Sequence, residues 1–213
     1  NTDGTINTTY TSANTTSGMS IIQYSGNGSA GATIGHGIGV APKCVIIKRT
    51  DTTSNWIFGT GARGFDKFLY LNTTDAETTN SGTFNNTAPS SSVITLGSWN
   101  DVNNSSGTYI AYCFAEKQGF SKFGSYFGNG STDGSFIYLG MRSSFIMIKR
   151  TDAVSDWFMY DVTRDPLNPN TFALRASGSN AEVDDVGYSE HDHLSNGIKL
   201  RQTWDGLNAS GGT

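Results

Sequence analysis

The stretch Ile47-Lys48-Arg49-Thr50-Asp51 returns later in the chain as Ile148-Lys149-Arg150-Thr151-Asp152, a shift of 101 residues (148 − 47). A tryptophan follows the stretch in both places, as Trp56 and as Trp157. Two further blocks recur in the same order at shifts of 102 and 105 (126 − 24 and 198 − 93): 24–29 as 126–131, and 93–108 as 198–213. A period of about a hundred residues predicts a tandem duplication of a small domain rather than the short turn of a solenoid.

The first copy contains a strand that the second copy lacks. Gly107-Thr108 leads into Tyr109–Ala115, an apolar and aromatic run typical of a buried strand. In the second copy the matching position is Thr213, the last residue of the sequence. We expect the counterpart either to lie beyond Thr213, or to be replaced by residues 1–17 or by a neighbouring chain, because an unpaired sheet edge accepts an added strand.

The composition indicates an all-β protein. Of the 213 residues, 36% are hydrophobic and 15% are charged, and Gly, Ser, Thr and Asn fill much of the difference. This profile is typical of short strands joined by many turns, and no stretch has the pattern of a useful amphipathic helix. We predict an antiparallel β-sandwich or jelly roll, either as two small sandwiches or merged into one. The expected division is 1–17 as a linker or edge strand, 18–116 as the first repeat, and 117–213 as the second repeat without its closing strand.

Strands are expected where apolar runs end in turn signals. In the first copy they are Met19–Tyr24, Cys44–Thr50, Trp56–Phe58, Lys67–Asn72, Val93–Leu96 and Tyr109–Ala115. In the second copy they are Phe120–Tyr126, Phe145–Thr151, Trp157–Met159, Phe172–Arg175 and Gly197–Arg201.

The charge pattern excludes several classes of partner. The net charge is −4 (14 − 18), and no basic cluster exceeds Lys48-Arg49, so we expect no nucleic-acid partner. No apolar run is long enough to span a bilayer and no signal peptide begins the sequence, so we expect no membrane insertion. Cys44 and Cys113 lie in apolar runs, and Phe145 replaces Cys44 in the second copy, which favours a core role; a disulfide between the two remains open.

Nearly the whole chain resembles a known family. The residues that carry the resemblance are Tyr24 with Gly26-Asn27-Gly28, His36–Lys43, Ile46–Arg49 with Trp56, Leu194–Leu200, and Asn103 with Ser106–Glu116. They resemble a repeated domain of uncharacterised function in structural proteins of tailed phages, especially phages of marine cyanobacteria. The second copy departs from the pattern at Phe136–Arg142, where the His-Gly and Pro of the first copy are absent.

The resemblance implies a concanavalin A-like jelly roll in a tail fibre or another surface appendage. It further implies a protein made in the host cytoplasm and carried on the phage particle. Other virion proteins, copies of the same chain and a host surface polysaccharide are the partners that it implies. It carries no established catalytic residues.

Trp99 and Trp204 are the strongest candidates for a carbohydrate-binding site. Both lie in the polar loop before the closing strand, the first beside Asn100 and Asp101 and the second beside Asp205. An indole can stack on the apolar face of a sugar ring while amide and carboxylate groups bond to its hydroxyls. The alternative is that each indole folds back as a lid on its own core.

The densest group of possible metal ligands lies between Glu182 and His193. On an extended strand His191 and His193 would face one side, which suits a metal, and Asp184 and Asp185 could bind calcium through oxygen. No known spacing is matched and the first copy has no equivalent, so a solvated loop is the alternative. We expect no bound metal and no cofactor.

Catalysis has no motif to support it. The available acids are Asp161, Asp165, Asp184, Asp185 and Glu190, but no spacing pairs them, and no nucleophile or phosphate-loop pattern occurs. Together with the resemblance, this favours a non-enzymatic virion module that attaches weakly and multivalently to host glycans. A purely structural module that contacts neighbouring subunits, and a polysaccharide-cleaving domain, are the alternatives.

Overall fold

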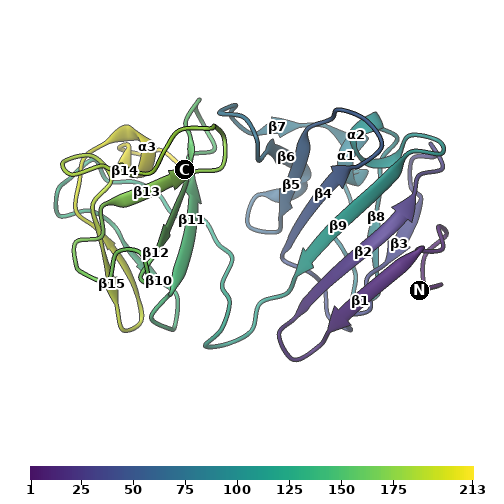
Figure 1. Cartoon of the computed structure of the whole chain (residues 1–213), viewed down its shortest axis with the longest axis horizontal. Coiled ribbons are helices and arrows are strands. Elements are labelled where there is room, and N and C mark those ends of the chain that lie inside the picture. The colour runs from purple at the N-terminus through teal and green to yellow at the C-terminus, as the bar shows by residue number, and fades with distance from the viewer. The chain divides into compact units, whose positions relative to one another are not determined.

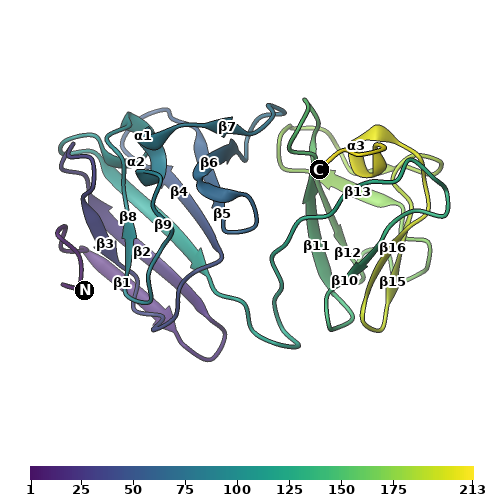
Figure 2. The same cartoon turned by 180° about the vertical axis from the view of Figure 1, so that it is seen from behind.

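The structure is a computed structural model that describes residues 1–213. It is all-β, as the composition predicts, with 36% of the residues in strands and 6% in helices, and its sheets are antiparallel. The chain divides into two compact units, Asn1–Tyr70 with Thr78–Gly124, and Leu71–Glu77 with Ser125–Thr213. Figure 1 and Figure 2 show the strands of the units from opposite sides.

A seven-stranded sheet dominates the first unit (Figure 1). Its order is β1-β2-β9-β4-β5-β6-β7. In that order the strands are Tyr10–Asn14, Met19–Ser25, Thr108–Phe114, Cys44–Arg49, Trp56–Thr60, Gly64–Tyr70 and Thr78–Thr79. The last strand of the first unit, β9, lies in the middle of the sheet, paired with β2 on one side and β4 on the other.

A second layer covers one face of this sheet. It consists of the paired strands β3 (Thr33–Gly35) and β8 (Val93–Thr95) and the short helices α1 (Ser81–Phe84) and α2 (Asn100–Asn103), which Figure 2 shows in front of the sheet. The hydrophobic core draws its buried residues from both layers.

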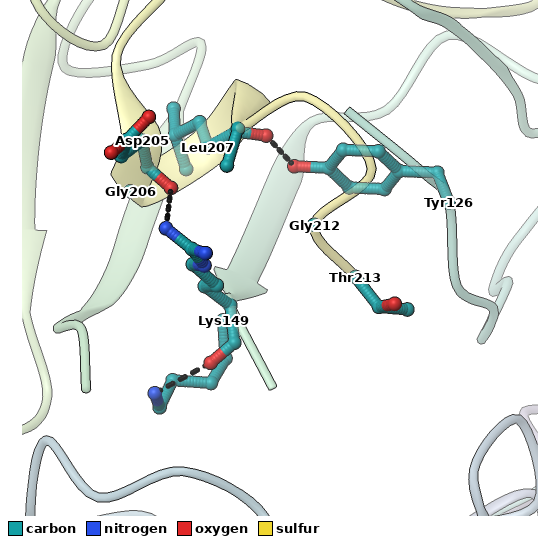
Figure 3. A pocket seen from close by; sticks show the side chains of 9 residues that line it. Tyr126, Lys149, Asp205, Gly206, Leu207, Gly212 and Thr213 are labelled. Atoms are coloured by element: carbon teal, nitrogen blue, oxygen red, sulfur yellow. Dashed lines mark hydrogen bonds between the residues drawn. The ribbon is translucent and has the colours of Figure 1, made fainter. Parts of the chain in front are cut away.

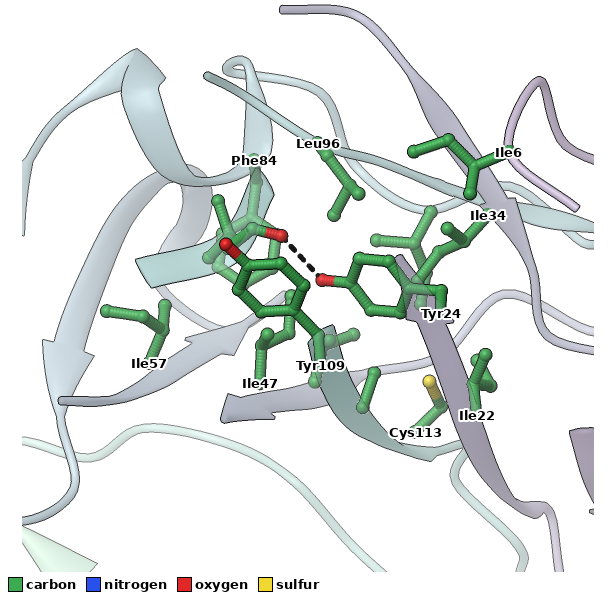
Figure 4. Packing of buried hydrophobic residues seen from close by; sticks show 14 of the residues in the cluster. Ile6, Ile22, Tyr24, Ile34, Ile47, Ile57, Phe84, Leu96, Tyr109 and Cys113 are labelled. Atoms are coloured by element: carbon green, nitrogen blue, oxygen red, sulfur yellow. Dashed lines mark hydrogen bonds between the residues drawn. The ribbon is translucent and has the colours of Figure 1, made fainter. Parts of the chain in front are cut away.

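Strand β9 supplies every second residue to that core. Tyr109, Ala111 and Cys113 are fully buried, because side chains along a strand alternate between its two faces. The ring of Tyr109 stacks on that of Tyr24, with 5.1 Å between the ring centroids and 17° between the planes (Figure 4).

The second unit has two smaller sheets. One has the order β11-β12-β13-β14, formed by Phe145–Lys149, Trp157–Asp161, Phe172–Arg175 and Val183–Asp184. The other has the order β10-β16-β15, formed by Phe136–Tyr138, Gly197–Leu200 and His191–Leu194. A short helix, α3, spans Asp205–Asn208. Strand β11 pairs with β12 alone and is an edge strand, whereas its counterpart β4 has neighbours on both sides.

The strand predicted at Phe120–Tyr126 is wrong. Most of this segment is irregular, with no strand hydrogen-bonded to it. Its counterpart β2 is paired on both sides, by β1 and by β9, and the second unit provides neither neighbour. An extended segment without partners forms no ladder of backbone hydrogen bonds, so the apolar pattern alone does not make it a strand.

Residues 1–17 belong to the first unit. Strand β1 forms the edge of the large sheet beside β2, and Ile6 is buried in the core and bridges to Ile34. The expectation that this segment fills the gap in the second sheet is therefore wrong, since β1 is already paired with β2.

The two cysteines are core residues. Cys44 and Cys113 are buried and both thiols are free, so the disulfide that the sequence left open is not formed. Burial raises the pKa of the Cys44 thiol to about 12, and it raises that of Cys113 as well.

No helix in the structure has the length and the apolar character that crossing a membrane requires.

Candidate functional site

The two predicted binding tryptophans pack against their own cores. Trp99 precedes α2 and Trp204 precedes α3, and each is half-buried. The indole of Trp99 meets the ring of Phe68 edge-on, with centroids 5.2 Å apart, and that of Trp204 meets Phe158 in the same way at 5.1 Å. This is the packing of the alternative in which each indole is a lid, although part of each ring stays exposed.

The polar neighbours of these tryptophans also have structural partners. Asp101 accepts a hydrogen bond from the hydroxyl of Ser54 at 2.5 Å, and the carbonyl of Asn100 accepts one from Tyr109 at 2.7 Å. In the second unit the carbonyl of Asp205 accepts a bond from Arg150 at 3.2 Å. The structure therefore keeps each set beside its tryptophan. The Asp101 carboxylate is bonded to the protein, whereas Asn100 and Asp205 are exposed and are bonded through their backbone carbonyls.

A buried asparagine organises the turn of each unit. Asn103 is fully buried, and its Nδ2 donates to the carbonyls of Ser29 and Gly97 at 3.0 and 2.9 Å and to Asn27 Oδ1 at 3.3 Å. Its Oδ1 accepts from the amide of Asn27 at 2.9 Å. Every polar atom of this side chain is satisfied, and the Gly-Asn-Gly-Ser turn is held against α2.

Asn208 makes the same bonds in the second unit. Its Nδ2 donates to Asn129 Oδ1 and to the carbonyls of Ser131 and Gln202 at 3.1, 2.8 and 2.7 Å, and its Oδ1 accepts from the amide of Asn129 at 2.9 Å. The two asparagines are matched in the repeat, but their burial was not predicted from the sequence. Repetition of a polar residue at the same place in both copies is the signal that could have found them.

The glycine that opens each of these turns lies against backbone. A Cβ built at Gly26 would lie 2.3 Å from the carbonyl oxygen of Asn104, and one at Gly128 would lie 2.3 Å from that of Ala209. Real Cβ atoms do not approach so closely, so only glycine fits at either position.

The predicted histidine pair is buried rather than open to a ligand. His191 and His193 lie on β15 and share one side of it, as expected, with their Nε2 atoms 3.2 Å apart. Both are almost fully buried, and the ring of Tyr160 meets that of His191 edge-on at 4.5 Å. The His193 Nδ1 atom lies 3.0 Å from the Ser143 hydroxyl, and His191 Nδ1 lies 3.2 Å from the Ser189 carbonyl.

A neutral pair satisfies three of these contacts, but not that of the Ser143 carbonyl, which lies 3.0 Å from the same His193 Nδ1 atom. The Ser143 hydroxyl donates to His193 Nδ1, His193 Nε2–H donates to His191 Nε2, and His191 Nδ1–H donates to the carbonyl of Ser189. Burial lowers the pKa of His191 to about 4 and also lowers that of His193, which keeps both rings neutral. No group of three or more His, Cys, Asp or Glu side chains in the chain has the geometry to hold a metal ion.

The candidate catalytic acids hold loops together instead of facing one another. Asp161 pairs with Arg164, and the buried carboxylate of Asp165 accepts the backbone amides of Thr171 and Phe172 at 2.7 and 3.3 Å. The other acids lie elsewhere: Asp184 is exposed on β14, Asp185 pairs with Arg175, and Glu190 accepts from Gln202 and from the amide of Gly187. Each of these carboxylates except that of Asp184 is thus bonded to a basic side chain, a side-chain amide or a backbone amide.

Exposed apolar side chains are concentrated in the second unit. The first unit exposes three large ones, Tyr10, Val40 and Phe120. The second unit exposes ten: Phe127, Phe136, Tyr138, Phe145, Val154, Leu167, Phe172, Val183, Val186 and Tyr188. Tyr188 is 60% exposed and meets the half-buried Trp204 edge-on at 6.5 Å.

A hollow in the second unit lies beside Thr213. Tyr126, Arg150, Asp205 and Leu207 are among the residues that line it (Figure 3). The Tyr126 hydroxyl donates to the carbonyl of Leu207 at 2.7 Å, as the hydroxyl of its counterpart Tyr24 donates to the carbonyl of Val102. This hollow was not predicted from the sequence.

The chain matches a known protein family. A family model described as a domain of unknown function, DUF7483, matches residues 1–213, the whole of the chain. No curated protein and no solved structure matches it.

Proposed function

We propose that this chain, which belongs to the DUF7483 family, is a non-enzymatic structural module that associates with copies of itself through its second unit. The observation that carries the proposal is the unequal exposure of apolar side chains, ten large ones in the second unit against three in the first. Extensive exposed apolar surface on a folded protein is typical of an interface. The resemblance to phage appendage proteins supports the same role, within a tail fibre or another part of the virion surface.

We further propose that the two units derive from one duplicated design of the concanavalin A-like jelly-roll type. The support is a set of matched hydrogen bonds at the repeat shift. The amide of Gly26 bonds to the carbonyl of Gly107 as that of Gly128 bonds to Gly212, and the amide of Thr50 bonds to the carbonyl of Thr108 as that of Thr151 bonds to Thr213. The matched hydrogen bonds thus lie at positions that also correspond in the repeated sequence blocks.

The exposed face of β10 gives a sharp test of self-association. Phe136 and Tyr138 are 47% and 65% exposed on this short strand, and neither belongs to the core. We expect the wild-type chain to form dimers or larger species in sedimentation as its concentration rises. A double variant, Phe136→Lys with Tyr138→Lys, should shift the equilibrium toward monomer at least tenfold.

Tyr10→Lys is the matched control, since Tyr10 is 62% exposed on β1 of the first unit. It should leave the association constant unchanged. A wild-type chain that stays monomeric at all concentrations, or one that Tyr10→Lys affects as strongly as the β10 variant, would overturn the proposal.

Contact with a host surface polysaccharide is a second candidate, favoured by one observation. Trp204 has the exposed ring of Tyr188 beside it, so two aromatic faces and the exposed Asp205 gather at one surface. Sugar rings stack on such aromatic surfaces. In a glycan array Tyr188→Ala should abolish binding, and Trp99→Ala in the first unit should not. Binding that survives Tyr188→Ala would exclude this site.

A further inference from the structure

The hollow beside Thr213 occupies the place that a tyrosine ring fills in the first unit. There Tyr109 stacks on Tyr24 (Figure 4). It also lies against the guanidinium carbon of Arg49, 6.0 Å from the ring centroid, and against α2. Its hydroxyl donates to the carbonyl of Asn100 and accepts the amide of Asn104, both at 2.7 Å.

Each of these contacts has a counterpart around the hollow. At the repeat shifts of 101 to 105 residues, Tyr24, Arg49, Asn100 and Asn104 correspond to Tyr126, Arg150, Asp205 and Ala209, and all four of the latter line the hollow. Figure 3 shows the Tyr126 ring and the α3 backbone on its border. The hollow, which we call the seat, is therefore lined by an aromatic face, a cation and a carbonyl that correspond to the groups around Tyr109.

One backbone donor in the seat has no partner. The amide of Ala209, a residue only 7% exposed, makes no hydrogen bond in the structure, whereas the matching amide of Asn104 bonds to the Tyr109 hydroxyl. Buried amides without an acceptor are rare and costly. The carbonyl of Asp205 accepts only from Arg150, whereas that of Asn100 accepts from both Arg49 and Tyr109. A phenol hydroxyl placed here would satisfy both groups.

The backbone at Thr213 already has the register of a strand that enters this space. The carbonyl of Thr213 accepts the amide of Thr151 at 2.6 Å, as that of Thr108 accepts the amide of Thr50 at 2.8 Å immediately before β9 begins to pair with β4. Beyond this point β11 has a free edge, and the segment 120–126 lacks the neighbour that β2 has.

We propose that the hollow is the binding seat for a tyrosine that begins an extended segment in line with Thr213, and that this segment pairs antiparallel with β11. The first unit defines the expected register, since Tyr109, Ala111 and Cys113 lie opposite Arg49, Ile47 and Val45. In the second unit the tyrosine should therefore lie opposite Arg150, and small or apolar side chains should lie opposite Ile148 and Ile146. Phenylalanine would fill the space but leave the Ala209 amide unpaired. This inference rests on the hydrogen bonds of the seat and does not depend on the proposed self-association.

The test extends the chain after Thr213 with a copy of Tyr109–Ala115 in which serine replaces the copied cysteine. Two matched extensions carry alanine or phenylalanine in place of the first tyrosine. Hydrogen exchange of the Ala209 amide and of the β11 amides reports the seat and the edge directly. We expect the tyrosine extension to slow exchange at Ala209 at least tenfold, the phenylalanine extension to protect β11 but not Ala209, and the alanine extension to protect neither.

Two outcomes would overturn the proposal. The first is equal protection by the tyrosine and alanine extensions, which would show that the hollow does not select the ring. The second concerns the same segment added as a separate peptide, at micromolar concentration, to the unextended chain. If this peptide protected the amides as strongly as the attached extension does, the result would contradict a segment in line with Thr213. Sedimentation of the same proteins distinguishes these results from a failure of the self-association proposal.

Discussion

The first unit and the second unit use the same bonds at their turns and short helices, yet they enclose very different cores. The core cluster of the first unit contains 19 buried hydrophobic residues, and that of the second contains 7. The buried asparagine, the turn that it holds and the tyrosine bonded to the short helix are present in both. The shared contacts therefore determine the local geometry of the turns and short helices, but they do not determine the size of the core.

One strand of the first unit has no counterpart in the second. Strand β9 joins two halves of the large sheet and places three fully buried side chains in the core. The second unit, without a strand in that position, has two separate sheets and an irregular segment at 120–126. A central strand thus contributes more than its own burial, because its neighbours depend on it for pairing.

Removing the Tyr109 ring should have the largest effect on this comparison. Tyr109→Ala opens in the first unit the same hollow that the second unit contains, and it leaves the amide of Asn104 unpaired. We expect the free energy of unfolding of the first unit to fall by about 3–5 kcal/mol. Urea unfolding followed by hydrogen exchange, resolved for each unit, measures this loss. The control Tyr10→Ala, on the exposed edge strand, should change the free energy of unfolding little. Equal effects of the two variants would contradict the central role of β9.

Acid should destabilise the second unit next. Burial lowers the pKa of His191 to about 4, whereas an imidazole in the unfolded chain has a pKa of about 6.5. Between these values the unfolded chain binds a proton that the folded chain does not, so stability is complete above pH 6.5 and falls as the pH decreases toward 4. The shift corresponds to about 3 kcal/mol at full extent.

Urea midpoints of the second unit at pH 7.5 and pH 5 test this expectation. Burial also lowers the pKa of His36 in the first unit, so His36→Gln serves as the control that removes the contribution of that unit. A midpoint of the second unit that does not change across this range would show that the histidine pair is not held neutral.

The buried asparagines should have an intermediate effect that is similar in the two units. Asn103→Ala and Asn208→Ala each leave several backbone groups of the turn without a partner, at a cost of about 1–3 kcal/mol. Thermal unfolding and the exchange rates of the Asn27 and Asn129 amides measure it. Asn104→Ala, which installs the residue that the second copy has at the matching place, is the control and should be nearly neutral. A large loss in one unit only would break the equivalence.

The smallest signal is expected from the cysteines, which report on the first unit alone. Because burial raises the pKa of Cys44 to about 12 and encloses Cys113 fully, a thiol reagent at pH 8 should label the native chain only through opening of that unit. Labelling should be slow in the wild type and faster in Tyr109→Ala. Rapid labelling of the wild type would show that the first core opens readily.

The repeated blocks and the period-two apolar runs predicted most strands correctly. Strand β13 has the expected bounds, and β2, β4 and β16 differ by one residue at one end. The prediction failed at 120–126, where the pattern of a strand is present but its partners are not. It also missed three four-residue helices, because such short turns carry no amphipathic period.

The predicted site was harder to read from the sequence than the fold. A tryptophan in a polar loop is compatible with a ligand platform and with a lid, and only the positions of Phe68 and Phe158 show that each indole rests on a core ring. For His191 and His193 the alternation of a strand correctly placed both rings on one side. It did not reveal that this side is the interior, since partners such as Ser143 are distant in sequence.

The two glycines pressed against backbone carbonyls have a consequence for how this chain tolerates variation. Gly26 and Gly128 face the same steric limit, although the cores around them differ greatly in size. In a saturation library scored for folded protein, both positions should accept no other amino acid, while many apolar positions of the second unit accept several. Intolerance at such sites would then mark backbone geometry common to both halves, and it would give no measure of the stability of either half.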